Sequence, residues 1–323
     1  MPSSKSARDE SPRGAFVDAA VGRTGLGNML FPWARAEVFS QRLGIPMLAP
    51  QWTQPKVGPL LRREKDLRYY TGLFDDRSYV RGARRWLAWV GRKRVDGASI
   101  GIDAAPDQIR GSLNRTLIVF RGWRGWFRDD LPRHREWVRQ RLESIVTDAV
   151  RAEIRSFDRP VEIAIHVRRG DMGRNLVPPG AEMGGPDENV VQSEYYFLSV
   201  LRKIRQDVGR AVPATVFTDA HEGELKELPT EEKVTIAPPH TAVADLLLMS
   251  RAAVLVTSSA SSFSAWASYL GGMPTIWQRT RVGLVLPDRP ERSIESDPHG
   301  NLDGSSREVV VQHLSASTSG AQV

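Results

Sequence analysis

The chain has 323 residues, of which 41% are hydrophobic and 26% charged, the composition of a folded globular protein. It contains no cysteine, which excludes disulfide scaffolds, thiol nucleophiles and zinc fingers. The net charge is +7 and most basic residues are arginine, the residue best suited to hold phosphate groups. The charge alone does not distinguish a nucleic acid, an anionic lipid or a phosphorylated small molecule as the partner.

The N-terminal half shows a few strong elements separated by irregular stretches. Residues 1–14 are polar and charged and indicate a disordered tail. A short apolar strand over 15–21 leads through a glycine-rich turn into a helix over 28–43. Residues 50–115 look irregular and rich in Arg and Trp, and they precede a strand over 116–121 and a helical pattern over 133–155. We expect the first lobe to span residues 15–158.

The second half alternates regularly between strand and helix patterns. Strands are predicted over 161–166, 214–218, 233–236, 252–257 and 274–277, and helices over 193–207, 222–228, 241–251 and 262–270. Such alternation predicts a parallel α/β sheet of the nucleotide-binding kind, with ligands at the carboxyl ends of the strands. We expect this lobe to span residues 159–284 and a loosely ordered tail to cover 285–323.

The segment His166-Val167-Arg168-Arg169-Gly170-Asp171 directly follows an apolar strand. Adjacent arginines at the carboxyl edge of a sheet favour an anionic ligand such as a phosphate. The alternative is a solvated loop held by an internal Arg–Asp pair.

A run of serines, from Ser258 to Ser264, separates an apolar strand from the next helix. The first turn of a helix offers unpaired N–H groups to an anion, and serine hydroxyls add hydrogen-bond donors. Capping of the helix by serine explains the same residues without a ligand. Asp245, in the first turn of the preceding helix, has two interpretations as well: it stabilises the helix dipole, or it accepts hydrogen bonds from a nucleoside.

Three further features are less specific. The turn from Gly22 to Asn28 lacks the spacing of dinucleotide-binding or Walker motifs, and the six histidines show no metal-binding spacing. We therefore predict that no metal is needed. The basic segment Arg81–Arg94 interleaves Arg with Trp; it can contact a membrane surface, stack on sugars, or pack as an ordinary amphipathic helix.

Taken in order, these motifs resemble the α1,2-fucosyltransferases and their relatives in the wider fucosyltransferase superfamily. The resemblance covers roughly residues 15–278. It rests on the Gly25, Gly27, Asn28 turn with Phe31 and Trp33, Gly122-Trp123, the H-V-R-R-G-D loop, Tyr195-Tyr196, Phe217-Thr218-Asp219, the helix from Asp245, and Ser261 to Trp266. The chain departs from the family pattern in Ala265-Trp266 and in the long loop 172–191.

The resemblance implies a GT-B-like fold of two Rossmann-like lobes, with the donor in the cleft and bound mainly by the C-terminal lobe, and the acceptor on the side of the N-terminal lobe. It further implies metal-independent, inverting transfer of fucose from GDP-fucose to a glycan hydroxyl, with α1,2 linkage to galactose. By matching position, the catalytic candidates are Arg168 and Asp171. The implied donor-binding residues are Gly27, Asn28, His166, Arg168, Arg169, Asp245, Ser261, Ser262 and Phe263.

These implications give a set of expectations about partners and place. GDP-fucose is the expected donor, and no further cofactor is expected. The acceptor is a glycan, with a lipid-linked one among the candidates, and no nucleic acid is expected. We expect a cytoplasmic protein, with peripheral contact to the inner membrane face through Arg81–Arg94 as one option. The alternatives are a GDP-sugar transferase with another donor sugar or a non-glycan acceptor, and a catalytically silent nucleotide- or polyanion-binding protein.

Overall fold

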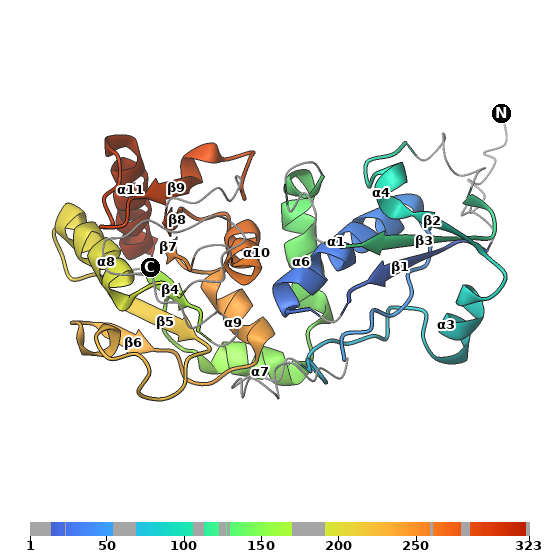
Figure 1. Cartoon of the computed structure of the whole chain (residues 1–323), viewed down its shortest axis with the longest axis horizontal. Helices are drawn as coiled ribbons and strands as arrows, with labels where there is room; N and C mark the ends of the chain where they lie inside the picture. The colour runs from blue at the N-terminus through green and yellow to red at the C-terminus, as the bar shows by residue number, and fades with distance from the viewer. Residues whose placement is uncertain are drawn as a thin grey trace, which may run out of the picture. The chain divides into compact units, whose positions relative to one another are not determined.

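The structure of the chain, a computed structural model, divides into two compact units (Figure 1). It describes residues 14–22, 24–53, 69–105, 113–122, 127, 130–169, 191–258, 261–278 and 285–320. The first unit comprises Met1–Thr24, Asn28–Trp52 and Phe74–Arg124, and the second comprises Gly25–Gly27, Thr53–Leu73 and Gly125–Val323. The second unit therefore includes two short pieces of chain that lie early in the sequence.

The first unit contains a three-stranded parallel sheet with the order β1-β3-β2. The strands are β1 (Phe16–Ala20), β2 (Lys93–Asp96) and β3 (Thr116–Arg121), and the helices are α1 (Leu26–Leu43), α3 (Gly82–Trp89) and α4 (Gly97–Ile100). Alternate residues of β3 point to opposite faces of the sheet. Leu117 packs with Ala88 of α3, whereas the ring of Phe120 lies 5.3 Å from that of Phe39 in α1. Helices therefore cover both faces of this sheet.

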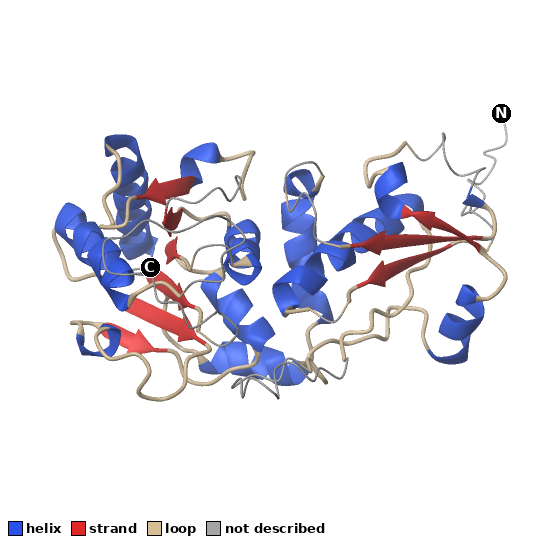
Figure 2. Ribbon diagram, viewed as in Figure 1, coloured by secondary structure: helices blue, strands red, loops and turns tan. Residues whose placement is uncertain are grey.

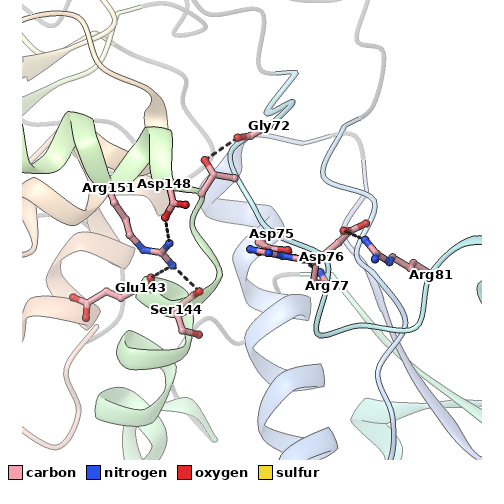
Figure 3. A network of polar contacts seen from close by, with 10 residues as sticks. Gly72, Asp75, Asp76, Arg77, Arg81, Glu143, Ser144, Asp148 and Arg151 are labelled. Atoms are coloured by element: carbon pink, nitrogen blue, oxygen red, sulfur yellow. Dashed lines mark hydrogen bonds and ion pairs between the residues drawn. The ribbon is translucent and has the colours of Figure 1, made fainter.

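The loop that leads into α3 is fixed by two pairs of neighbouring charges (Figure 3). The carboxylate of Asp75 accepts hydrogen bonds from the backbone N–H of Arg77 at 2.8 Å and from its Nε at 2.6 Å. These bonds hold the pKa of Asp75 below its usual range. Arg81 pairs with Asp76 at 3.2 Å, so the residue that precedes α3 is anchored to the same loop.

The second unit contains a six-stranded sheet in which all neighbouring strands run parallel, in the order β6-β5-β4-β7-β8-β9 (Figure 2). The strands are β4 (Ile163–Val167), β5 (Ala214–Thr218), β6 (Val234–Ile236), β7 (Val254–Val256), β8 (Thr275–Gln278) and β9 (Ser293–Ser296). The chain thus builds the sheet outward from β4 in one direction and from β7 in the other. This is the doubly wound order, with its switch point between β4 and β7.

Helices cover both faces of this sheet as well. They are α6 (Arg135–Ile145), α7 (Asp148–Ser156), α8 (Glu194–Val208), α9 (Ala242–Met249), α10 (Ser262–Gly271) and α11 (Gly304–Gly320). Short 3₁₀ turns are η2 (Leu131–His134), η3 (Leu228–Thr230) and η4 (Pro290–Arg292). On one face α8 and α11 pack together over a core that includes Ile165, Val216 and Leu314. On the other face α10 packs against α9 and α6.

The single helical pattern expected over 133–155 forms two helices, because the chain is extended at Val146. Arg151 stabilises the junction: it donates to the Ser144 carbonyl at 2.8 Å and to the Asp148 carboxylate at 2.7 Å (Figure 3). Thr147 donates through its backbone N–H to the Leu73 carbonyl at 3.0 Å and through its hydroxyl to the Gly72 carbonyl at 2.9 Å. The segment around Gly72 therefore belongs to the second unit.

The predicted α/β architecture with parallel sheets is confirmed, and several boundaries need correction. The first unit ends near residue 124 rather than near 158, since α6 and α7 pack in the second unit. Residues 285–323 were expected to form a loose tail, but they provide β9 and α11, and Leu314 is fully buried in the core. The helix expected over 222–228 is absent from this described segment, which forms turns before η3. The irregular stretch 50–115 contains α3, β2 and α4.

Among the described residues, no helix is both long and apolar enough to cross a membrane.

Candidate functional site

The candidate site lies at the switch point of the six-stranded sheet, where the loops after β4 and β7 leave neighbouring strands. Arg168 and Arg169 follow β4 directly, and Thr257 and Ser258 follow β7. In doubly wound sheets, the crevice at this point is where ligands bind. The two motifs that the sequence indicated are therefore neighbours at the carboxyl edge of the sheet.

Ser258 joins the two loops by hydrogen bonds. Its backbone N–H and its hydroxyl each donate to the His166 carbonyl at 3.0 Å. The same hydroxyl accepts a hydrogen bond from the backbone N–H of Arg168 at 2.9 Å. These contacts fix the backbone on which the Arg168 side chain is mounted.

The first turn of α10 lies next to these loops and has a serine cap. The Ser261 hydroxyl is fully buried and accepts a hydrogen bond from the Ser264 N–H at 3.3 Å. The capping interpretation therefore holds for Ser261. The N–H groups of Ser262 and Phe263 precede the first intrahelical hydrogen bond of an α-helix, so they are the donors that an anion at this end of α10 would use.

His166 is buried beneath this turn. Its side chain lies on the face of the sheet that α10 covers, and its Nδ1 is 2.6 Å from the hydroxyl of Ser264. The ring centroid of Phe263 is 5.3 Å from that of His166. Burial lowers the pKa of His166 to about 4, with Asp219 opposing the shift and Arg168 adding to it. The ring is therefore neutral at pH 7 and connects β4 with α10.

The two arginines after β4 have different environments. Arg169 donates from its backbone N–H to the Asp219 carboxylate at 2.6 Å and from Nη1 to the Gln192 carbonyl at 2.7 Å. Burial lowers its pKa, against the attraction of Glu194, Glu224 and Asp219. These contacts tie Arg169 into the protein and hold the loop after β4 in shape. Arg168 is partly exposed at the end of β4.

Asp245 lies in the first turn of α9, and parallel βαβ topology places the start of this helix at the carboxyl edge of the sheet. Its Oδ1 is 3.0 Å from Nδ1 of His240, whose side chain is nearly buried. The helix start is held separately by Glu153 of α7, which accepts hydrogen bonds from the Thr241 N–H at 2.9 Å and hydroxyl at 2.7 Å. Asp245 therefore pairs with a histidine, while the carboxylate of Glu153 accepts the hydrogen bonds from the residue at the N-terminus of the helix.

Gly27 approaches the first turn of α10 more closely than any other residue type could. It belongs to the short segment Gly25–Gly27 of the second unit. A Cβ atom on Gly27 would lie 2.7 Å from the backbone nitrogen of Phe263 and 2.7 Å from the carbonyl carbon of Ser262. The next residue back, Leu26, donates its N–H to the Tyr70 hydroxyl at 2.8 Å. The glycine turn is thus held against α10 on one side and by Tyr70 on the other.

Replacement of Gly27 by alanine is expected to destabilise the protein by about 1–3 kcal/mol, the usual effect of overpacking. Helix propensity alone predicts that alanine stabilises the protein at this position, because Gly27 lies within α1. Urea unfolding measures the difference. The matched control is Gly304→Ala, at a helical position of the second unit with open space around it, which should not destabilise. A Gly27→Ala protein more stable than the unmodified chain would contradict the close approach.

Some of the predicted site residues lie together in the structure and others do not. His166, Arg168, Arg169, Ser261, Ser262 and Phe263 meet around the β4 and β7 ends of the second unit, and Gly27 contacts α10. Asn28 belongs to the first unit, and Asp171 lies outside the described residues.

Several residues of the site were not predicted. Glu153, Tyr70 and Gln192 lie far away in the sequence and belong to no motif. Ser258, Ser264 and Asp219 belong to the motifs, but no local pattern distinguishes them from their neighbours as supporting residues. Within the described part of the chain, no group of His, Asp and Glu side chains could hold a metal ion.

No protein-family model matches the chain, and no curated protein matches it. Among solved structures, the fucosyltransferase NodZ from Bradyrhizobium is 16% identical, with 81% of this chain and 94% of that chain covered and a TM-score of 0.47. FUT1 of Arabidopsis thaliana in complex with GDP is 16% identical, with 83% and 71% covered and a TM-score of 0.44. POFUT1 in complex with GDP is 12% identical, with 81% and 95% covered and a TM-score of 0.44.

Proposed function

We propose that the chain is a glycosyltransferase that transfers fucose from GDP-fucose to a hydroxyl of a glycan. The proposal includes inversion at the sugar carbon, independence of metal ions and α1,2 linkage to galactose. The observation that carries it is the junction of the Arg168 loop with the first turn of α10 at the switch point of a doubly wound sheet. The order of the sequence motifs gives the choice of donor.

The chemistry of such a transfer explains why these groups would be needed. Breaking the bond between fucose and GDP leaves negative charge on the departing diphosphate. Fixed donors aimed at this charge lower the barrier, because they need no reorganisation as the charge develops. We assign the Arg168 guanidinium and the N–H groups of Ser262 and Phe263 to this role. Ser258 holds the backbone of Arg168 by a hydrogen bond, and the contact between Ser264 and His166 holds the first turn of α10 against β4.

Recognition of the nucleoside is assigned to Asp245. A carboxylate accepts hydrogen bonds from the N1–H and the exocyclic amine of guanine, a pattern that adenine does not offer. His240 is 3.0 Å from Asp245 and orients it. We assign Gly27 and Asn28 to contacts with the diphosphate and the sugar of the donor. Asp171 remains the proposed acid–base group.

Calorimetric titration with nucleotides tests the donor class without knowledge of the acceptor. The full chain is titrated with GDP, ADP and UDP in EDTA, and slow hydrolysis of GDP-fucose and GDP-mannose is followed in parallel. We expect preferential, metal-free binding of GDP and faster hydrolysis of GDP-fucose. Binding without guanine preference would contradict the proposal and favour a polyanion-binding protein. Faster hydrolysis of GDP-mannose would favour another donor sugar.

Replacement of Asp245 by asparagine is expected to weaken GDP binding about 10–100-fold, because hydrogen bonds to a charged group contribute about 1.5–3 kcal/mol. ADP binding should hardly change. The matched control is Glu153→Gln, which weakens the cap of the same helix and should lower the melting temperature without changing the preference for guanine. If Asp245→Asn lowers only the stability, Asp245 is a partner of His240 and of the helix dipole instead.

A further inference from the structure

Helix α3 exposes the apolar face that a helix of a globular protein normally buries. Its inner face packs Ala88, which is 1% exposed, against Leu48, Leu117 and Val119. The opposite side presents Trp86, Leu87 and, directly after the helix, Val90, which are 68%, 56% and 55% exposed. These three residues, here called the α3 patch, are three or four positions apart or adjacent and so form one surface.

The chain segment that contains the α3 patch is basic. Residues 81–94 include six Arg or Lys residues and no Asp or Glu. Arg84 on α3 and Arg94 on β2 are exposed, and we call them the basic flank. The Arg94 guanidinium lies 4.6 Å from the ring centroid of Trp89, which keeps this charge next to the helix.

The orientation of α3 is fixed by contacts inside the first unit. Arg92 donates to the Leu87 carbonyl at 2.7 Å and to the Gly14 carbonyl at 2.9 Å, and its guanidinium lies 4.7 Å from the ring centroid of Phe16. Arg85 donates to the Ala49 carbonyl at 3.0 Å. The helix is therefore held with the α3 patch outward, rather than attached loosely.

We propose that the α3 patch and the basic flank bind the surface of an anionic lipid bilayer. A Trp with neighbouring aliphatic residues enters the boundary between headgroups and acyl chains, and flanking Arg and Lys residues are attracted to anionic headgroups. The phosphates of a nucleic acid would pair with the basic flank, but a nucleic acid would make no use of the apolar side chains of Leu87 and Val90. A stable protein partner needs roughly 20–30 residues per side, more than this short helix offers. The proposal does not depend on the proposed enzymatic function.

The test is flotation of the full chain with two kinds of vesicle: phosphatidylcholine alone, and phosphatidylcholine with phosphatidylglycerol. We expect binding to the anionic vesicles, decreasing with salt, and weak binding to the neutral ones. The variant W86S/L87S should lower the vesicle partition coefficient about tenfold or more, and R84E/R94E should abolish the preference for anionic lipid. The control variants I236S and K226E alter an exposed apolar and an exposed basic residue in the second unit and should bind normally.

Circular dichroism establishes whether each variant is folded. If W86S/L87S does not fold, the single variants L87S and V90S replace it. As a second measurement, brominated lipid should quench the tryptophan fluorescence of the bound protein, and Trp86→Phe should remove most of this quenching while retaining binding. Equal binding of W86S/L87S and the unmodified chain, or no binding to anionic vesicles, would overturn the proposal. So would a W86S/L87S variant whose only change is loss of a dimer in light scattering, which would assign the patch to a second copy of the chain.

Discussion

Replacement of Arg168 by alanine is expected to lower the rate of sugar transfer about 10²–10³-fold, the usual effect of removing one donor that stabilises developing negative charge. The reason is its place at the end of β4, where Ser258 fixes its backbone next to the first turn of α10. The measurement is the hydrolysis rate of GDP-fucose, which needs no acceptor, at saturating donor.

The structure offers informative comparisons for this variant. Arg168 is partly exposed, so the free energy of unfolding should change little. Arg169→Ala removes the half-buried side chain that donates to the Gln192 carbonyl and should instead lower the stability. Arg168→Lys keeps the charge but loses the planar fork, and should recover only part of the rate. Hydrolysis by Arg168→Ala at nearly the normal rate would remove Arg168 from the proposed mechanism.

Mild acid is expected to destabilise the protein through His166. In the unfolded chain its pKa is near 6.5, whereas burial lowers it to about 4 in the folded state. Above pH 6.5 the ring is neutral in both states and has no effect. As the pH falls from 6.5 to 4, only the unfolded state takes up the proton, so the free energy of unfolding falls; the full loss is about 3 kcal/mol at about 1.36 kcal/mol per pKa unit.

Urea unfolding at pH 7 and pH 4.5, for the unmodified chain and His166→Asn, isolates this contribution. Carboxylates titrate in both proteins, so the difference between the two pH dependences belongs to His166. We expect His166→Asn to be less stable at pH 7 because the contact with Ser264 changes, but to lose less stability on acidification. Identical pH dependences would show that folding does not change the pKa of His166 and would contradict this prediction.

The strands of the second unit are the part of the fold that the sequence predicted best. Each is a short apolar run between polar turns, and Ala214–Thr218 was predicted at its observed bounds. Helix α11 was missed because its sequence, rich in serine, has little helical preference. It forms because Val310 and Leu314, one turn apart, insert into the core beside α8. Helix α3 agrees with the interpretation of Arg81–Arg94 as an amphipathic helix, but its Trp86 and Leu87 side chains are exposed to solvent instead of packed in the core.

For the candidate site, the strand ends were predictable and the supporting contacts were not. The position of Arg168 follows from the end of an apolar strand, and that of Ser261 from the start of the next helix. Glu153 and Tyr70 form their hydrogen bonds with residues 88 and 44 positions away, so no local pattern reveals them. The close approach of Gly27 to Phe263 likewise depends on tertiary structure, although the glycine itself was noticed.

The interleaving of the two units along the chain restricts how such a protein can be recombined. Exchanging residues 1–124 with those of a relative would transfer the first unit, but also Gly25–Gly27 and Thr53–Leu73 of the second. The transplanted glycine turn would then have to fit the α10 of the host, and a residue in the place of Tyr70 would have to meet Leu26. Functional chimeras should therefore retain residues 25–27 and 53–73 of the host, so that the first unit is exchanged as three segments, 1–24, 28–52 and 74–124, rather than as one contiguous half of the gene.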